Sequence, residues 1–328
     1  MTLRRPTIGG LTKLFNFNSW QPERLRPCRV ARFYRGGALI GRLHGIEEPD
    51  GDRPEEWVGS VTPAWGERDE GLSRLESGRL LRDAIAADPE GWLGERHVQR
   101  FGVTTGLLVK LLDSAERLPV HAHPDRAFAS ERLDSPFGKT EAWLVLGTRG
   151  ASAEVWVGLR EPVPRERWLG WIEEQDTQAM LGSLNHVMVR SGDVVYVPAG
   201  VPHAIGAGVL LAELQEPTDF SLLCEWRGFP IDAEASHLGL GWDTAADALD
   251  LEPHEPVRRL PGEARRFFFA DSVAAPAGRF AVLLVLEGTG TIAGTQARPG
   301  DGFAVPAAAT DFAVAGDMRV LRCLAPDP

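Results

Sequence analysis

Cysteine is scarce in this chain of 328 residues, with only Cys28, Cys224 and Cys323, which lie far apart. Three scattered thiols form neither the paired framework of a disulfide-stabilised domain nor the closely spaced pairs of a zinc knuckle. They are typical of a protein in a reducing compartment. Residues 1–17 also lack the apolar stretch of a secretion signal, so we expect a cytoplasmic protein.

Long apolar runs and excess positive charge are missing as well. No segment approaches the roughly 18 consecutive apolar residues that a membrane-spanning helix needs, so we expect no membrane partner. The net charge is −11, whereas a nucleic-acid partner would require a basic face, so none is expected. This balance does not exclude an anionic small molecule, because a single pocket can be locally positive.

Glycine and proline, by contrast, are frequent, at 36 and 24 residues. A chain that turns this often is typical of a mainly β fold. Leucine residues at helix-like spacing, up to Leu111 and Leu112, predict a helical insertion over about residues 68–113, and a short helix is expected at residues 164–178. We expect strands at residues 29–34, 38–43, 57–61, 142–146, 154–159, 186–189, 194–197, 209–214 and 220–226.

One sequence pattern occurs twice. Residues 190–199 and 298–307 share Arg-x-Gly-Asp-x-x-x-Val-Pro-Ala, and each copy follows a similar apolar strand and turn. Two copies in the same order indicate two related β-barrels. We expect the first barrel, with the helical insertion, in residues 1–245 and the second in residues 255–328, after a linker rich in Asp, Glu and Pro.

Three histidines and a glutamate have the spacing of metal ligands. His121 and His123 are two positions apart, so on a strand they point to the same face. Glu141 leads into an apolar strand, where an unpaired carboxylate is costly to bury. His203 follows a strand and a tight turn rich in Pro and Gly. This donor set suits zinc, and also iron, manganese, cobalt or nickel, and the ion would keep a net positive charge that polarises a carbonyl or hydroxyl.

The second copy of the repeat lacks these ligands. Ala281 stands where the first copy has Glu141, and Asp311 stands where it has His203. We therefore interpret the second barrel as structural. The other five histidines are expected to be surface or hydrogen-bonded residues.

The spacing from Gly192 through Pro198 and Gly200 to His203 resembles the second motif of the cupin superfamily. Residues 108–113, 121–125, 138–143 and 196–206 resemble the class I mannose-6-phosphate isomerases (phosphomannose isomerases) of the short bacterial type. The resemblance implies two cupin-like β-barrels, or jelly rolls, the second of them degenerate. It also implies a zinc-dependent aldose–ketose isomerase that interconverts mannose 6-phosphate and fructose 6-phosphate, so the expected partner is a small sugar phosphate.

The resemblance further implies roles for individual residues. The zinc ligands would be His121, His123, Glu141 and His203, with His121 standing where the family has Gln. Lys139 would hold the phosphate or the sugar. Glu213 would be the acid or base that moves a proton between C1 and C2.

Two departures from the family pattern affect residues that would interact with the negatively charged substrate. Pro119 replaces a Ser that contacts phosphate in the family, and the Arg usually found a few residues after Thr218-Asp219 is missing from residues 220–224. Arg227 or Arg35 could take the place of this Arg, and Arg227 is our catalytic candidate.

Other functions stay open at this point. One is a diverged member that acts on another sugar or only binds its ligand. A less favoured one is a cupin oxygenase, because the same donors also suit Fe(II) with open positions. The native metal and the oligomeric state are not predicted.

Overall fold

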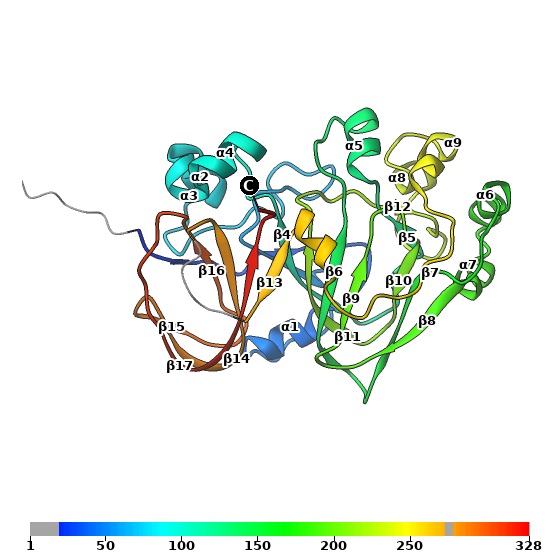
Figure 1. Ribbon diagram of the computed structural model, residues 1–328. Helices are drawn as coiled ribbons and strands as arrows, with labels where there is room; N and C mark the ends of the chain where they lie inside the picture. The colour runs from blue at the N-terminus through cyan, green and yellow to red at the C-terminus, as the bar shows by residue number, and fades with distance from the viewer. Residues whose placement is uncertain (1–19, 273–277, 328) are drawn as a thin grey trace, which may run out of the picture.

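The computed structural model describes residues 20–272 and 278–327. Residues 1–17, where no secretion signal is expected, lie outside this part of the chain. The described residues form a mainly β structure with antiparallel sheets, which confirms the expected cupin-like fold class (Figure 1). No helix among them is long and apolar enough to cross a membrane.

Two sheets pack face to face around the predicted site. Their facing side chains form one apolar cluster that includes Val145 and Leu211 from the first sheet and Val155 and Ile205 from the second. The first sheet has the order β2 (Arg29–Val30), β3 (Glu55–Val58), β4 (Leu108–Ser114), β11 (Val209–Gln215), β6 (Glu141–Thr148) and β9 (Val194–Val197). The second has the order β12 (Leu222–Leu223), β5 (His121–Ala122), β10 (His203–Ile205), β7 (Ala153–Leu159) and β8 (Leu184–Val189).

A third sheet is formed mainly by the C-terminal part of the chain, drawn in orange and red in Figure 1. Its order is β1 (Glu23–Arg24), β16 (Gly302–Val305), β14 (Ala281–Ile292), β17 (Val314–Leu324) and β13 (Phe269–Asp271), and β15 (Thr295–Ala297) pairs with β14. The edge strand β1 comes from the opposite end of the chain, so the N-terminal segment crosses from this sheet to β2 of the first one.

The sequence repeat is also a repeat of structure. Glu141 on β6 pairs with Val197 on β9, and Ala281 on β14 pairs with Val305 on β16. In each preceding turn the Asp side chain accepts a hydrogen bond of 3.0 Å from the backbone N–H of the repeat's first Arg. The Glu141 and Ala281 positions are therefore equivalent, and the second copy presents a methyl group where the first presents a carboxylate. The division of the chain into residues 1–245 and 255–328 stays a prediction.

Strands β4 and β11 are buried on both faces, and each face contacts a different core. On the outer face, Val109, Leu111 and Leu214 share a cluster with Val282 and Leu284 of the third sheet. On the inner face of the same strands lie Leu112 and Leu211. Because side chains alternate along a strand, Lys110 and Glu213 also lie on the inner face, directly opposite each other in register.

Short helices cover the ends of the sheets. The expected insertion contains α2 (Leu81–Ala87), α3 (Pro89–Leu93) and α4 (Glu95–Phe101), and the helix expected at residues 164–178 is α6 (Arg165–Glu174), followed by α7 (Thr177–Ser183). The remaining helices are α1 (Ala38–Leu43), α5 (Arg126–Arg132), α8 (Ala233–Ser236), α9 (Trp242–Ala245) and two 3₁₀ turns, Ala246–Ala248 and Gly262–Arg266.

Four local predictions were wrong, one of them the strand expected at residues 29–34, which is reduced to β2. Residues 38–43 form helix α1 and not a strand, because Asp113 Oδ2 accepts the backbone N–H groups of Gly37 and Leu39 at 2.8 Å and so caps a helical turn. Leu108, Leu111 and Leu112 belong to β4, since an apolar run buried on both faces imitates helical spacing. The strand expected at residues 220–226 is reduced to β12.

Gly36 lies in close contact with the backbone of Asp113. A Cβ added at Gly36 would lie 1.8 Å from the Asp113 carbonyl oxygen, and Gly36 and Gly51 exchange two backbone hydrogen bonds of 3.0 and 2.8 Å. We expect Gly36→Ala to lower the free energy of unfolding by about 3 kcal/mol, because a backbone atom cannot move aside as a side chain can. Urea denaturation measures the loss.

Gly51→Ala is the matched control, because a Cβ at Gly51 meets nothing within 4 Å. It should change the free energy of unfolding by less than about 1 kcal/mol. Equal stability of the two variants would contradict the close approach at Gly36.

Candidate metal centre

Three histidine rings meet inside the first barrel. His121 on β5 pairs directly with His203 on β10, and His123 follows β5 by one residue. Their ring centroids are 4.0 to 5.0 Å apart, and one nitrogen from each ring lies within 4.8 Å of the others. All three residues are buried. The turn before β10 depends on Gly200, whose φ of 86° is left-handed and whose N–H donates to the His123 carbonyl at 2.7 Å.

Backbone carbonyls fix the orientation of all three rings. Each Nδ1 lies 2.8 Å from a carbonyl oxygen, that of Pro119 for His121, of Phe220 for His123 and of Val201 for His203. A neutral ring must donate from Nδ1 to such an acceptor, which leaves the Nε2 lone pair free for an ion. Nε2 of His203 is buried and has no hydrogen-bond partner, as expected of a ligand atom.

Glu141 brings a carboxylate to the same point from the opposite sheet. Its Oε2 lies 3.1 Å from Nε2 of His123, its Oε1 lies 3.4 Å from Nε2 of His203, and Trp143 Nε1 donates to Oε1 at 2.9 Å. The ammonium group of Lys139 lies 2.8 Å from both Glu141 Oε2 and His123 Nε2. The point where these lone pairs converge therefore attracts a cation, and a divalent ion there would displace the Lys139 ammonium.

Burial and nearby charge keep the three histidines neutral and Glu141 ionised, which are the protonation states that can bind a metal ion. Burial lowers the pKa of His121 and His203, and burial followed by the charge of Lys139 lowers the pKa of His123 to about 3. Burial disfavours the Glu141 carboxylate, but Lys139 and then His123 outweigh it and hold its pKa well below the usual range. At neutral pH the site thus presents three neutral imidazoles and one carboxylate.

A second group of buried charges adjoins the first, and the sequence analysis assigned no role to most of it. Lys110 Nζ lies 3.6 Å from Glu55 Oε2, 3.6 Å from Asp219 Oδ1 and 3.9 Å from Glu213 Oε1. The Arg32 guanidinium forms two hydrogen bonds with Asp219, at 2.8 and 3.2 Å, and its Nε lies 3.2 Å from Glu55 Oε1. A lysine within the apolar run of β4 is the one sequence signal that could have indicated this group.

Glu213 links the two groups of charges. Its Oε1 lies 3.7 Å from Lys139 Nζ, while Lys110 approaches the same oxygen from the neighbouring strand. Burial and then the negative charge of Glu141 raise the pKa of Glu213 to about 8. Glu213 can therefore hold a proton at neutral pH and can release it to an acceptor in the cavity.

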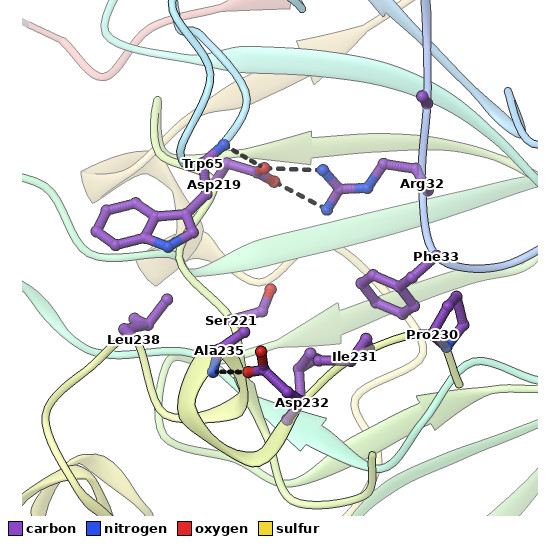
Figure 2. A pocket seen from close by; sticks show the side chains of 12 residues that line it. Arg32, Phe33, Trp65, Asp219, Ser221, Pro230, Ile231, Asp232, Ala235 and Leu238 are labelled. Carbon is purple, nitrogen blue, oxygen red and sulfur yellow. Dashed lines mark hydrogen bonds and ion pairs between the residues drawn. The ribbon is translucent and has the colours of Figure 1, made fainter. Parts of the chain in front are cut away.

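Two adjacent cavities lie beside these residues. The inner one, of about 30 Å³, is lined by His121, Lys139, Glu141 and Glu213 among others. The outer pocket, of about 500 Å³, is shown in Figure 2. Both are lined by Arg32, Phe33, Ser221 and Leu223, so the outer pocket adjoins the inner cavity at these residues.

The structure brings together six of the seven predicted site residues, namely His121, His123, His203, Glu141, Lys139 and Glu213. Arg227 lies apart from them, because its exposed guanidinium donates to the Glu174 carbonyl at 3.1 Å. The alternative, Arg35, is also exposed and donates to the Asp50 carbonyl at 2.9 Å. The guanidinium at the cavity belongs to Arg32, which the sequence analysis missed.

Comparison with known proteins gives related sequences, although no family model matches the chain. Mannose-6-phosphate isomerase of Streptococcus mutans is 31% identical over 188 residues, which make up 56% of this chain and 54% of that protein. A Bacillus subtilis protein provisionally named a mannose-6-phosphate isomerase is 26% identical over 92% of this chain and 98% of its own length. The chain thus aligns with about half of the first relative and nearly all of the second.

Solved structures show the same fold. The mannose 6-phosphate isomerase of Bacillus subtilis superposes with a TM-score of 0.72 at 23% identity, over 92% of this chain and 99% of that one. A mannose 6-phosphate isomerase bound with zinc and yttrium superposes with a TM-score of 0.68 at 18% identity, over 94% and 100%. The family resemblance predicted from the sequence is confirmed.

Removal of one ring should remove the ion. We expect His203→Ala to bind zinc about 100-fold more weakly than the parent. The substitution removes a buried ligand nitrogen, Nε2, in a ring that the hydrogen bond from Nδ1 to a backbone carbonyl already holds in place. Metal content after gel filtration measures the loss, and circular dichroism reports the fold. His186→Ala is the control, since His186 is half exposed and lies beside Glu154 and Trp156, neither of which is a proposed ligand. Full metal retention by His203→Ala would disprove its role as a ligand.

The metal-free protein should lose stability as the pH falls below 6.5. The pKa values of the three imidazoles are lowered in the folded chain, so the unfolded chain binds protons there that the folded chain does not. Between pH 7 and 5.5 the three histidines should contribute a loss of up to about 4 kcal/mol, of which the proton bound by Glu213, whose pKa is raised to about 8 in the folded chain, offsets about 2 kcal/mol. Urea denaturation of chelator-treated protein at both pH values measures it. A variant with all three histidines changed to Gln should lose most of this dependence, and an unchanged dependence would refute the assignment.

Proposed function

We propose that this chain, which resembles the mannose-6-phosphate isomerases in sequence and fold, is a metal-dependent isomerase that interconverts mannose 6-phosphate and fructose 6-phosphate. The observation that carries the proposal is the convergence of three oriented imidazoles and Glu141 beside two buried proton-carrying groups, Lys139 and Glu213. An aldose–ketose isomerase needs these two parts, a cation for the developing negative charge and a group that moves a proton between C1 and C2.

Zinc is the proposed ion, because three imidazoles and one carboxylate form a common zinc donor set, and other divalent transition metals remain compatible with it. A neighbouring structure is described as bound with zinc. His121, His123, Glu141 and His203 would hold the ion, which when bound supplies positive charge that stabilises negative charge on the sugar's oxygens.

Glu213 is the proposed proton carrier. In the inner cavity its carboxyl group faces Lys139 and Lys110, and its pKa of about 8 lies close to neutral pH. A group with this pKa can accept the proton from one carbon and return it to the other, because neither its protonated form nor its ionised form is strongly favoured near neutral pH. Lys139, beside the same oxygen, would hold a sugar hydroxyl or carbonyl oxygen in place once the ion occupies the lone pairs of His123 and Glu141.

The proposed location is the cytoplasm. All three cysteines are free thiols, and burial raises the pKa of Cys224 to about 12 and disfavours the thiolate of Cys323 as well. Unreactive, unpaired thiols of this kind suit a reducing compartment, where soluble sugar phosphates are metabolised.

Incubation of the zinc-loaded protein with mannose 6-phosphate in D₂O tests the function. We expect fructose 6-phosphate to form and deuterium to enter the sugar at C2 or C1 to some extent, as followed by NMR. Glu213→Gln should lower kcat about 100-fold or more, because the amide cannot carry the proton, while metal content stays unchanged. Oxygen consumption with bound iron would indicate an oxygenase instead, and binding without exchange or turnover would indicate a binding protein.

A further inference from the structure

We infer that Arg32 binds the anionic end of the substrate and determines the preference for phosphorylated over unphosphorylated sugar. The inference rests on the proposed function and names a residue that recognises the substrate at the same site. It is carried by the position of Arg32 between the two cavities.

The sizes of the cavities require a substrate that spans both. The inner cavity, at about 30 Å³, has room for about one water molecule, so a hexose phosphate cannot fit there entirely. Its reacting carbons must lie near Glu213 and the metal ligands, and the remainder must extend into the outer pocket of about 500 Å³. The phosphate on the far end of the sugar then lies at the junction of the cavities or beyond it.

Arg32 is the cation found at this junction. Lys110 and Lys139 line only the inner cavity, whereas Arg32 lines both. Among the described residues around the outer pocket, Arg32 is the sole cation. A phosphate that leaves the inner cavity therefore meets positive charge only at this guanidinium.

The guanidinium is held in a fixed position. Asp219 accepts two of its hydrogen bonds, and Asp219 is itself fixed by the backbone N–H of Trp65 at 3.0 Å, as Figure 2 shows. Lys110 shares both carboxylates that face Arg32, those of Asp219 and Glu55. Two of the five N–H donors are thus used by Asp219 and Nε faces Glu55 Oε1 at 3.2 Å, so two N–H groups remain for a phosphate oxygen.

Apart from Arg32, three polar side chains among the described residues line the outer pocket, those of Asp219, Ser221 and Asp232, and its other walls are apolar. Phe33, Ile231 and Leu238 line it, and Trp65, which is 50% exposed, lies on its rim beside Phe220 at 5.2 Å between ring centroids (Figure 2). Such walls can contact the C–H faces of a sugar but do not distinguish a phosphate from a hydroxyl. The Ser221 hydroxyl can bond to either group, and the two carboxylates repel a phosphate, so a preference for the phosphorylated sugar must come from Arg32.

Steady-state kinetics of the zinc-loaded protein with mannose 6-phosphate and with mannose tests the inference. For Arg32→Gln we expect kcat/KM for mannose 6-phosphate to fall about 100-fold or more, mainly through KM, and kcat/KM for mannose to change less than about threefold. Arg32→Lys, which keeps the charge without the planar fork, should be intermediate. Arg35→Gln and Arg227→Gln are matched controls and should behave as the parent.

Two results would overturn the inference. One is an unchanged preference in Arg32→Gln, and the other is an equal loss on both sugars, which a merely structural role predicts. If Arg32→Gln does not fold, the same comparison is made with Arg32→Lys, where an unchanged preference for the phosphorylated sugar overturns the inference.

Failure of the proposed function is distinguishable from failure of this inference. If the parent turns over neither sugar, the isomerase proposal fails. Calorimetric titration with inorganic phosphate then tests Arg32 alone, and binding should weaken at least tenfold in Arg32→Gln but not in Arg227→Gln. Equal phosphate binding by the two variants would refute the role of Arg32.

Discussion

The alternation of opposite charges inside the first barrel is the constraint on which the site depends. Burying one ionised group without a partner costs several kcal/mol, so each buried cation here lies beside a carboxylate. Lys139 joins the Glu141 carboxylate to Glu213, which can hold a proton at neutral pH. Lys110 joins Glu213 to the carboxylates of Glu55 and Asp219, and Arg32 closes the series between these two. The series extends from the metal ligands to the mouth of the pocket, and it fixes side chains from several strands and two loops in one arrangement.

The sheet that contributes no ligand still shapes the site. Strands β4 and β11 present Lys110 and Glu213 inward only because their alternate residues, such as Leu111 and Leu214, are buried against the third sheet. A shift of either strand by one residue would turn these charged groups into the apolar layer between the sheets, at a large cost. The second copy of the repeat, with Ala281 in place of Glu141, therefore supports the geometry of the first.

The ligands could be predicted from the sequence because their signals are local. His121 and His123 are two residues apart, so strand periodicity places their rings on one face, and a recognisable turn rich in Pro and Gly marks His203. Arg32 could not be found in this way, since its partner Asp219 is 187 positions distant and nothing near either residue indicates the pair. Arg227 was the natural choice in the chain segment where the family has an Arg, but Glu174 and Gln175 hold this segment away from the cavity. The leucines of β4 likewise have helix-like spacing in the sequence, and the structure explains this spacing because the strand is buried on both faces.

The pairing of β1 with β16 has a consequence for how the protein is made. Glu23 and Arg24 leave the ribosome long before their partners, Ala304 and Phe303, are translated. The segment that leads from β1 to Arg32 also pairs with residues 74–76, because Leu25 and Leu75 form a bridge and the Glu76 N–H donates to the Arg24 carbonyl at 2.9 Å, so only its contact with the third sheet waits for the end of synthesis. The third sheet is therefore completed last, and it closes against the first sheet after all the residues of the proposed site, from Arg32 to Asp219, have been made.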